Sequence, residues 1–451
     1  MKTFKSIARL LGFLCLWPAC LNAQTIADKS DSLLSAYYKQ DLFTGTVLIA
    51  QKGMVVFEKS YGMANREASV SNSSATQYRI GSLSKPFTSL IILQLKEKGL
   101  INLSDPLSKY LPGFSKGDSV TIENLLNHTS GIRSFTSTRR YNTDRMNITG
   151  RGDVLDILKA EPFVFSPGSS WQYSNSNYIL LSYIAEDLSK KSMTLQIQEL
   201  CTKLGLKNTG MDFDGRIAPL KAKGYEAVAL QDYMPVADQN IAIISGAGGM
   251  YSSAPDLLKL DRALYSEQIL SDATKQQMFK PGKGDYGYGW ETGNFKGRME
   301  LGHSGSIEGF KSMILRYPES ETCIVFLSNY WNTPGQMICD NLKAIVFNEP
   351  YQLPASRNFI SLPESQLKAF EGEFSFKGAM SMIIKAESGQ LLSIIKGQPI
   401  VSFKPLNERE FYNKSNNAEM SFQKDAAGIF QSFKLVKGKQ AMEWTRKEAA
   451  K

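Results

Sequence analysis

The sequence predicts an α+β fold, an antiparallel sheet flanked by helices with a helical subdomain, followed by a C-terminal antiparallel β domain. Two observations carry this prediction. Strand-like runs stand near both ends of the first part of the chain, and helix-like segments fill the interval between them. A sheet built from both ends of a domain is typical of α+β architecture. Beyond a passage with three prolines, the pattern changes to short strands separated by Gly, Asp and Asn turns.

The N-terminus has the pattern of a secretory signal peptide over residues 1–23. Three basic residues precede an apolar run from Leu10 to Trp17, and Ala23 offers a small residue at the expected cleavage position. The run is too short to cross a bilayer comfortably, which disfavours a membrane anchor. Lipid attachment at Cys20 is the other alternative. We therefore expect an exported protein, periplasmic or extracellular, with no stable membrane span after cleavage.

Composition limits the function further. The 451 residues are 42% hydrophobic and 21% charged, which is ordinary for a globular protein large enough for more than one domain. The formal net charge of +9 falls to +6 once the three basic residues of the leader are removed. No aromatic-interleaved basic stripe occurs, so nucleic acid is not an expected partner. With two histidines and neither a CxxC nor an HExxH pattern, we expect no metal site, and without a P-loop no nucleotide cofactor.

The first domain, predicted over residues 24–349, opens with an amphipathic helix, Ile26–Lys39. A hairpin follows, with strands at 46–50 and 54–58 joined through Lys52 and Gly53. Residues 83–98 read as a long helix closed by Gly99. Between about 100 and 240, helices alternate with loops rich in Pro, Gly and Ser.

The second half of this domain returns to strands. Ser253 is expected to cap a helix, with Asp256 completing a capping box. Residues 286–290, 310–317 and 322–327 read as neighbouring antiparallel strands.

We place a linker at 350–359 and a separate β domain at 360–451. Within that domain, strands are expected at 380–386, 391–395, 419–422 and 432–436. The remaining cysteines, Cys201, Cys323 and Cys339, are odd in number and far apart, so at most one disulfide could form.

Ser82 and Lys85 form the first candidate catalytic pair. A serine at a helix start lies near the positive end of the helix dipole, and a lysine three residues on returns to the same face. A desolvated lysine there can lose its proton and act as a base. The alternative is a plain N-cap with a solvated lysine, and the SxxK spacing recurs at Ser365, Ser393 and Ser421. Only the pair at Ser82 opens a long apolar helix.

Tyr173 and Asn175 form the second candidate. A tyrosine near a cation can take a proton, and an asparagine offers both a donor and an acceptor to a substrate amide. Taken alone, a half-buried packing tyrosine and a turn-forming asparagine explain the pattern better. Tyr330 and Asn332 have the same spacing.

The third candidate is His303-Ser304-Gly305, the one HxG in the chain. It leads into a predicted strand, and a glycine at a strand edge exposes backbone groups with which a substrate can pair. A neutral histidine hydrogen-bonded within a turn is the alternative interpretation.

The three motifs occur in the order SxxK, YxN, HxG and span most of residues 24–345. In this order they resemble the serine β-lactamase and penicillin-binding-protein superfamily, in its class C-like branch, which also holds D-aminopeptidases, D-Ala-D-Ala carboxypeptidases and esterases. Four further stretches share the resemblance: 78–82, 125–131, 246–253 and 286–290. The resemblance implies a β-lactamase/transpeptidase-like fold.

The resemblance also implies roles. Ser82 would be the nucleophile, with proton transfer shared by Lys85 and Tyr173. Asn175 would orient the substrate amide, and His303, Ser304 and Gly305 would form the third edge of the site. The oxyanion hole would consist of the backbone N–H groups of Ser82 and Ser306. His128, in the stretch 125–131, would be structural support.

The third motif departs from the Lys-Thr-Gly of typical β-lactamases. His303 is mostly neutral at neutral pH, whereas a lysine is charged, so binding of a substrate carboxylate is expected to be weaker. We therefore expect a D-amino-acid peptidase, a D-Ala-D-Ala carboxypeptidase-like enzyme or an esterase, acting on small peptides, amides or esters, cell-wall peptides included. A β-lactamase proper and a non-catalytic binder that kept the cleft are the alternatives.

Overall fold

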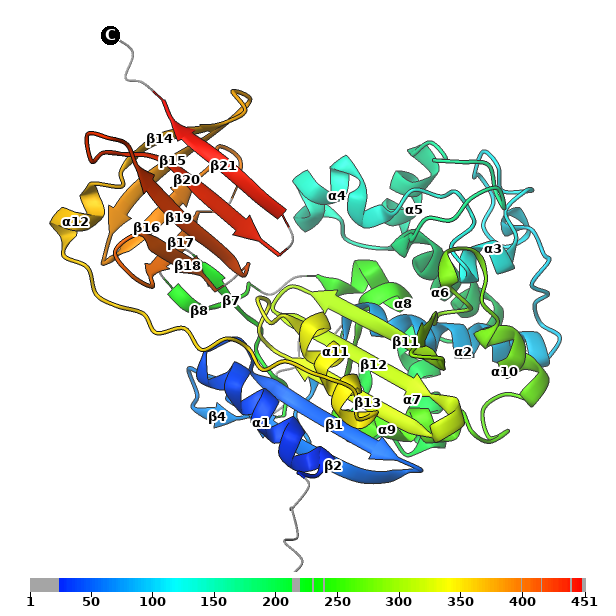
Figure 1. The fold of residues 1–451 in the computed structure, drawn as a ribbon. Helices are drawn as coiled ribbons and strands as arrows, with labels where there is room; N and C mark the ends of the chain where they lie inside the picture. Colours follow the sequence, from blue (N-terminus) through cyan, green and yellow to red (C-terminus); the bar gives the residue numbers. More distant parts are fainter. Residues whose placement is uncertain are drawn as a thin grey trace, which may run out of the picture.

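The computed structural model describes residues 24–212, 220–228, 231–237, 240–398, 400–414, 416–438 and 440–447. It contains a six-stranded sheet with helices on both faces and a closed eight-stranded barrel built from the C-terminal part of the chain (Figure 1). The predicted fold class is confirmed. The predicted signal peptide, residues 1–23, lies outside the described residues.

The large sheet joins the two ends of the first domain. Its strands run in the order β10-β11-β12-β13-β1-β2, and every neighbouring pair is antiparallel. The bounds are β1 (Gly45–Gln51), β2 (Met54–Tyr61), β10 (Glu291–Phe295), β11 (Arg298–Ile307), β12 (Phe310–Tyr317) and β13 (Thr322–Ser328). Because β1 lies between β2 and β13, residues 283 positions apart, Gly45 and Ser328, face each other.

The alternation of side chains along β1 divides the core into two halves. Val47 and Ile49 face the half covered by α1 (Ile26–Lys39) and α11 (Gly335–Val346), which contact each other (Figure 1). Leu48 faces the other half, which is the larger and contains α2 (Ser84–Glu97). Successive side chains of a strand point to opposite faces, so a run of apolar residues indicates a sheet covered on both sides.

The other helices of this part of the chain lie between α2 and β10 in the sequence. Their bounds are α3 (Ile122–Leu126), α4 (Arg139–Asp144), α5 (Arg151–Ala160), α6 (Asn175–Ser189), α7 (Met193–Leu204), α8 (Ser245–Gly248), α9 (Ala254–Ala263) and α10 (Asp272–Phe279). Short strands form three small sheets: β3 (Met63–Asn65) with β4 (Val70–Ser71), β5 (Tyr78–Arg79) with β9 (Met250–Ser252) and β6 (Gly210–Met211), and β7 (Tyr225–Val228) with β8 (Gln231–Pro235).

The C-terminal barrel follows α12 (Glu364–Lys368) and closes through the pairing of its first and last strands. Its strands are β14 (Gly372–Phe376), β15 (Met380–Glu387), β16 (Gln390–Ile394), β17 (Val401–Pro405), β18 (Glu410–Asn413), β19 (Ala418–Lys424), β20 (Phe430–Lys437) and β21 (Gln440–Arg446). Its interior is filled by aromatic rings, among them Phe374, Phe422 and Phe433. Four of the eight strands match predicted ones; β14, β17, β18 and β21 were not predicted. The domain boundaries stay a prediction.

The prediction that Ser253 is a helix N-cap is confirmed by its position before α9, but two other local predictions are wrong. The expected capping box is absent: the Ser253 hydroxyl makes no capping bond, and the Asp256 carboxylate accepts from the backbone N–H of Asn208 and from Thr209. Residues 286–290 are not a strand; the strand begins one residue later, at Glu291. Cys201, Cys323 and Cys339 are buried, and none forms a disulfide. Within the described part of the chain, no helix has both the length and the apolarity needed to cross a bilayer.

Candidate functional site

Ser82 lies in a short 3-10 helix, Gly81–Leu83, that leads directly into α2. Gly81 has φ +49°, and a Cβ there would lie 3.0 Å from the backbone of Ser306 in β11. The Ser312 hydroxyl of β12 donates to the carbonyl of Ile80 at 2.7 Å. The serine turn is therefore packed backbone against backbone on the sheet, which fixes the position of Ser82 relative to β11.

The Lys85 amine is the centre of the site. Its Nζ lies 3.0 Å from Ser82 Oγ and donates to Asn175 Oδ1 at 2.8 Å and to the carbonyl of Ala247 at 2.8 Å. The side chain is fully buried. Burial lowers the pKa of Lys85 well below 10.5, since the charged form is poorly solvated. A buried amine of lowered pKa in contact with a hydroxyl can accept the proton of that hydroxyl.

Tyr173 and Asn175 come from the segment that enters α6. The Tyr173 ring centroid lies 4.8 Å from Lys85 Nζ. Burial raises the pKa of the Tyr173 phenol, and its hydrogen bond with the Ser82 hydroxyl lowers it in part. Asn175 is held by the Ser134 hydroxyl, which accepts from its backbone N–H at 3.1 Å, and by Thr136, which accepts from Nδ2 at 2.9 Å. These contacts orient Oδ1 toward Lys85.

His303 is buried and held between two groups. The Ser304 carbonyl lies 2.6 Å from Nδ1, so Nδ1 carries the proton, because a carbonyl only accepts. The hydroxyl of Tyr286 lies 2.8 Å from Nε2 and donates to it. Burial lowers the pKa of His303 to about 3, so the imidazole is neutral at neutral pH. The expected loss of positive charge at the third motif therefore has a structural basis.

The edge of β11 is open beside the serine. β10 pairs with β11 only as far as Gly302, and residues 303–307 pair with β12 on the other side. A Cβ at Gly305 would lie 2.0 Å from the carbonyl of Ile80, so only glycine allows this approach. Within the described ranges, no named strand covers the free edge of residues 303–307. Apart from those of Ser304, which contact His303 and Glu291, backbone groups on this edge can pair with an extended substrate.

The structure thus brings together Ser82, Lys85, Tyr173 and Asn175 around one hydroxyl, and sets the His303–Ser306 edge beside them. His128 packs beside the site: its ring centroid lies 4.5 Å from that of Tyr173, and the backbone N–H of Ser174 donates to its Nδ1 at 3.3 Å.

Several participants were not found from the sequence. The Ala247 carbonyl, Tyr286 and Glu291 contact the site, as do the hydroxyls of Ser134 and Thr136. Ala247 and Tyr286 lie in stretches that resemble the family, and this resemblance could have indicated them. No sequence pattern indicated Glu291. Its carboxylate accepts from the Ser304 hydroxyl at 3.3 Å and lies 4.0 Å from His303 Nδ1.

The other SxxK motifs and the second YxN motif do not contribute side chains to the site. Ser365 lies in α12, and Ser393 and Ser421 in barrel strands. Asn332 accepts a hydrogen bond from the backbone of Ala227 at 2.7 Å. In the described ranges, no group of three or more His, Cys, Asp or Glu side chains is placed to hold a metal ion.

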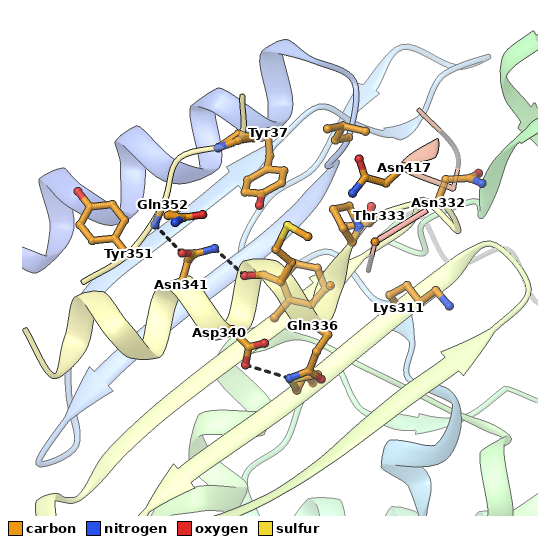
Figure 2. A pocket seen from close by; sticks show the side chains of 18 of the residues that line it. Tyr37, Lys311, Asn332, Thr333, Gln336, Asp340, Asn341, Tyr351, Gln352 and Asn417 are labelled. Carbon is orange, nitrogen blue, oxygen red and sulfur yellow. Dashed lines mark hydrogen bonds between the residues drawn. The ribbon is translucent and has the colours of Figure 1, made fainter. Parts of the chain in front are cut away.

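A groove of about 1500 Å³ opens on the α1 and α11 side of the sheet (Figure 2). Tyr37 of α1 and Asn341 of α11 line one part of it, and Lys311 and Asn417 line the part nearer the barrel. Ser304, Gly305 and Ser306 border it, whereas Ser82, Lys85 and Tyr173 do not. The groove is therefore adjacent to the candidate site rather than part of it.

The fold and the site together define the class of protein. A serine, a lysine and a tyrosine meet at the edge of an antiparallel sheet, as in serine β-lactamases and penicillin-binding proteins. Comparison with known proteins agrees. The Beta-lactamase family profile matches residues 24–345, and the chain therefore belongs to this family. Penicillin-binding protein 4* of Bacillus subtilis strain 168 is 30% identical over 418 residues, covering 86% of this chain and 92% of that protein.

Solved structures show the same fold. A penicillin-binding protein from Bacillus halodurans covers 69% of this chain and 98% of its own, with 25% identity and a TM-score of 0.62. An octameric penicillin-binding protein homologue from Pyrococcus abyssi covers 92% and 99%, with 24% identity and a TM-score of 0.64. A D-amino acid amidase from Ochrobactrum anthropi SV3 covers 71% and 98%, with 19% identity and a TM-score of 0.62.

Proposed function

We propose that this protein is an exported serine hydrolase that cleaves small amide, peptide or ester substrates through an acyl-Ser82 intermediate. The observation that carries the proposal is the Lys85 amine, fully buried and 3.0 Å from Ser82 Oγ. Complete burial disfavours the charged form of an amine. A buried amine kept neutral beside a hydroxyl is typical of a functional site. Export rests on the sequence pattern of residues 1–23, and N-terminal sequencing of the mature protein tests it.

In the acylation step, Ser82 Oγ attacks the substrate carbonyl carbon while its proton passes to the Lys85–Tyr173 pair. The carbonyl oxygen becomes an oxyanion facing the backbone N–H groups of Ser82 and Ser306. Two such donors stabilise the transition state by about 3 kcal/mol each. The C–N or C–O bond then breaks, and Tyr173 returns the proton to the departing amine or alcohol.

In the deacylation step, a water molecule attacks the acyl-Ser82 ester and gives its proton to the same pair. The ester bond breaks, a carboxylic acid leaves, and the proton returns to Ser82 Oγ. The cycle adds one water across the scissile bond and leaves the enzyme unchanged. The pair must exchange protons twice in each cycle, which suits a lysine of lowered pKa and a tyrosine of raised pKa in contact with one hydroxyl.

A penicillin-binding activity is the second candidate. Similarity to penicillin-binding protein 4* over most of both chains favours it. Acylation of Ser82 by a β-lactam needs the same groups, and the two candidates differ only in the rate at which water removes the acyl group.

Intact-mass spectrometry tests both candidates. The protein is incubated with penicillin, a D-Ala-D-Ala peptide and a p-nitrophenyl ester. We expect a covalent adduct on Ser82 whose lifetime depends on the substrate. Ser82→Ala should show none, and Ser365→Ala, which removes the serine of another SxxK pair, should label like the wild type. An adduct of equal yield on Ser82→Ala would refute the assignment. A long-lived penicillin adduct favours the penicillin-binding activity, and its rapid turnover a β-lactamase.

A further inference from the structure

This inference rests on the proposed function and concerns the leaving group of the substrate. The oxyanion faces Ser82 and Ser306, and Tyr173 returns the proton to the departing atom. The leaving group therefore lies on the side of Tyr173 that faces the third motif, where the rings of Tyr173 and His303 are 6.3 Å apart. The side chains at this end decide which leaving groups are accepted.

Neither side-chain donor of the third motif is free to bind a substrate. The Nδ1 proton of His303 is donated to the Ser304 carbonyl at 2.6 Å, and Nε2 accepts from Tyr286 at 2.8 Å. The Ser304 hydroxyl has one hydrogen, which it donates to Glu291 Oε1 at 3.3 Å. A carboxylate on the leaving group would have to take this hydrogen from Glu291.

Glu291 also places a carboxyl group at this end; burial raises its pKa, and its hydrogen bonds with Ser304 lower it in part. Its side chain is 50% exposed, so it faces the solvent from which substrate arrives. Lys85 offers this carboxylate no accessible counter-charge, because its amine is fully buried, has a lowered pKa and contacts three other groups. A carboxylate bound at Ser304 would lie roughly 5 Å from that of Glu291, close enough for like charges to repel.

We propose that Glu291 is a specificity-determining residue that disfavours leaving groups with a free carboxylate and favours neutral or cationic ones with N–H donors, such as carboxamides and amines. Glu291 does not touch the reacting atoms. It acts by holding the Ser304 hydroxyl and by presenting an acceptor where a carboxylate would otherwise bind. The substrates selected are amidated or esterified peptides rather than peptides with a free C-terminus next to the scissile bond.

Two esters with the same acyl group test this. One has glycolate as the leaving alcohol and the other glycolamide, which differ only in a carboxylate against a carboxamide. We expect kcat/KM for the glycolamide ester to exceed that for the glycolate ester by roughly tenfold, the effect of like charges at this range in a partly screened site. In Glu291→Gln the preference should fall toward one. Because both esters are measured on each variant, a general change in activity cancels in the ratio.

Glu308→Gln is the matched control, since it makes the same charge change at the other end of the free β11 edge, where Glu308 pairs with Arg145 at 2.9 Å. The control should keep the wild-type ratio. A wild-type ratio near or below one, or an unchanged ratio in Glu291→Gln, overturns this inference alone. Failure of both esters to acylate wild-type Ser82 overturns the proposed function and this inference with it.

Discussion

Replacing Gly305 with alanine should separate the free edge of β11 from the serine turn. The new Cβ would lie 2.0 Å from the Ile80 carbonyl oxygen and 2.3 Å from Ser312 Oγ, whereas real contacts of this kind are not shorter than 3.0 Å. β11 must therefore move by about 1 Å, and Ser306 moves with it. A displacement of about 1 Å in a catalytic arrangement costs on the order of 100-fold in rate. The added methyl group should also lower the free energy of unfolding by about 1–3 kcal/mol.

The assay is the rate of Ser82 acylation by a p-nitrophenyl ester, with thermal unfolding measured on the same preparation. Gly293→Ala is the control: it lies on the neighbouring strand β10, and its Cβ would meet nothing closer than 4.0 Å. We expect the control to keep the wild-type rate. A folded Gly305→Ala variant that acylates as fast as the wild type would show that contact between β11 and the serine turn does not set the geometry of the site.

Two further predictions concern charge. The rate on a neutral ester should rise with pH as the Lys85–Tyr173 pair loses a proton, with an apparent pKa below 10.5 because burial lowers the pKa of Lys85. The pH–rate profile should show no second transition near pH 6.5, since the pKa of His303 is lowered to about 3. A profile that is flat between about pH 5 and pH 9 would contradict the assignment of the Lys85–Tyr173 pair as the base. Arg316→Met should lower the free energy of unfolding in urea by about 3–5 kcal/mol, because Arg316 Nε donates to Asp261 at 2.6 Å and both side chains are buried. Adding Asp261→Leu to this variant should recover part of the loss, and a single variant as stable as the wild type would refute the reasoning.

The fold was predictable where the sequence pattern is local. The helix Ile26–Lys39 has the predicted bounds, and a capping box at Thr25 and Asp28 begins it. The hairpin of β1 and β2 followed from alternating strands around Lys52 and Gly53. The strand prediction for residues 286–290 was wrong, because their aromatic residues fit a strand but make separate tertiary contacts: Tyr286 bonds to His303, Tyr288 to Glu123, and Trp290 packs on Phe279.

The same contrast holds for the barrel. Four strands were predicted from apolar alternation, and β14, β17, β18 and β21 were not. Closure depends on the pairing of Phe374 in β14 with Arg446 in β21. Contacts between residues so far apart leave no local signal. The residues of one strand do not specify which distant strand will pair with it, because other strands have a similar pattern.

By itself, the sequence determined the order of the chemical groups: Ser82 with Lys85 at helical spacing, then Tyr173 with Asn175, then a histidine where related proteins have a lysine. Only the tertiary structure decided their protonation and direction. Lys85 has a lowered pKa because it is fully buried, and the donors of His303 and Ser304 are directed away from the substrate because Tyr286 and Glu291 lie against them. A pKa and a hydrogen-bond direction depend on the atoms that surround a group, and those atoms come from distant parts of the chain.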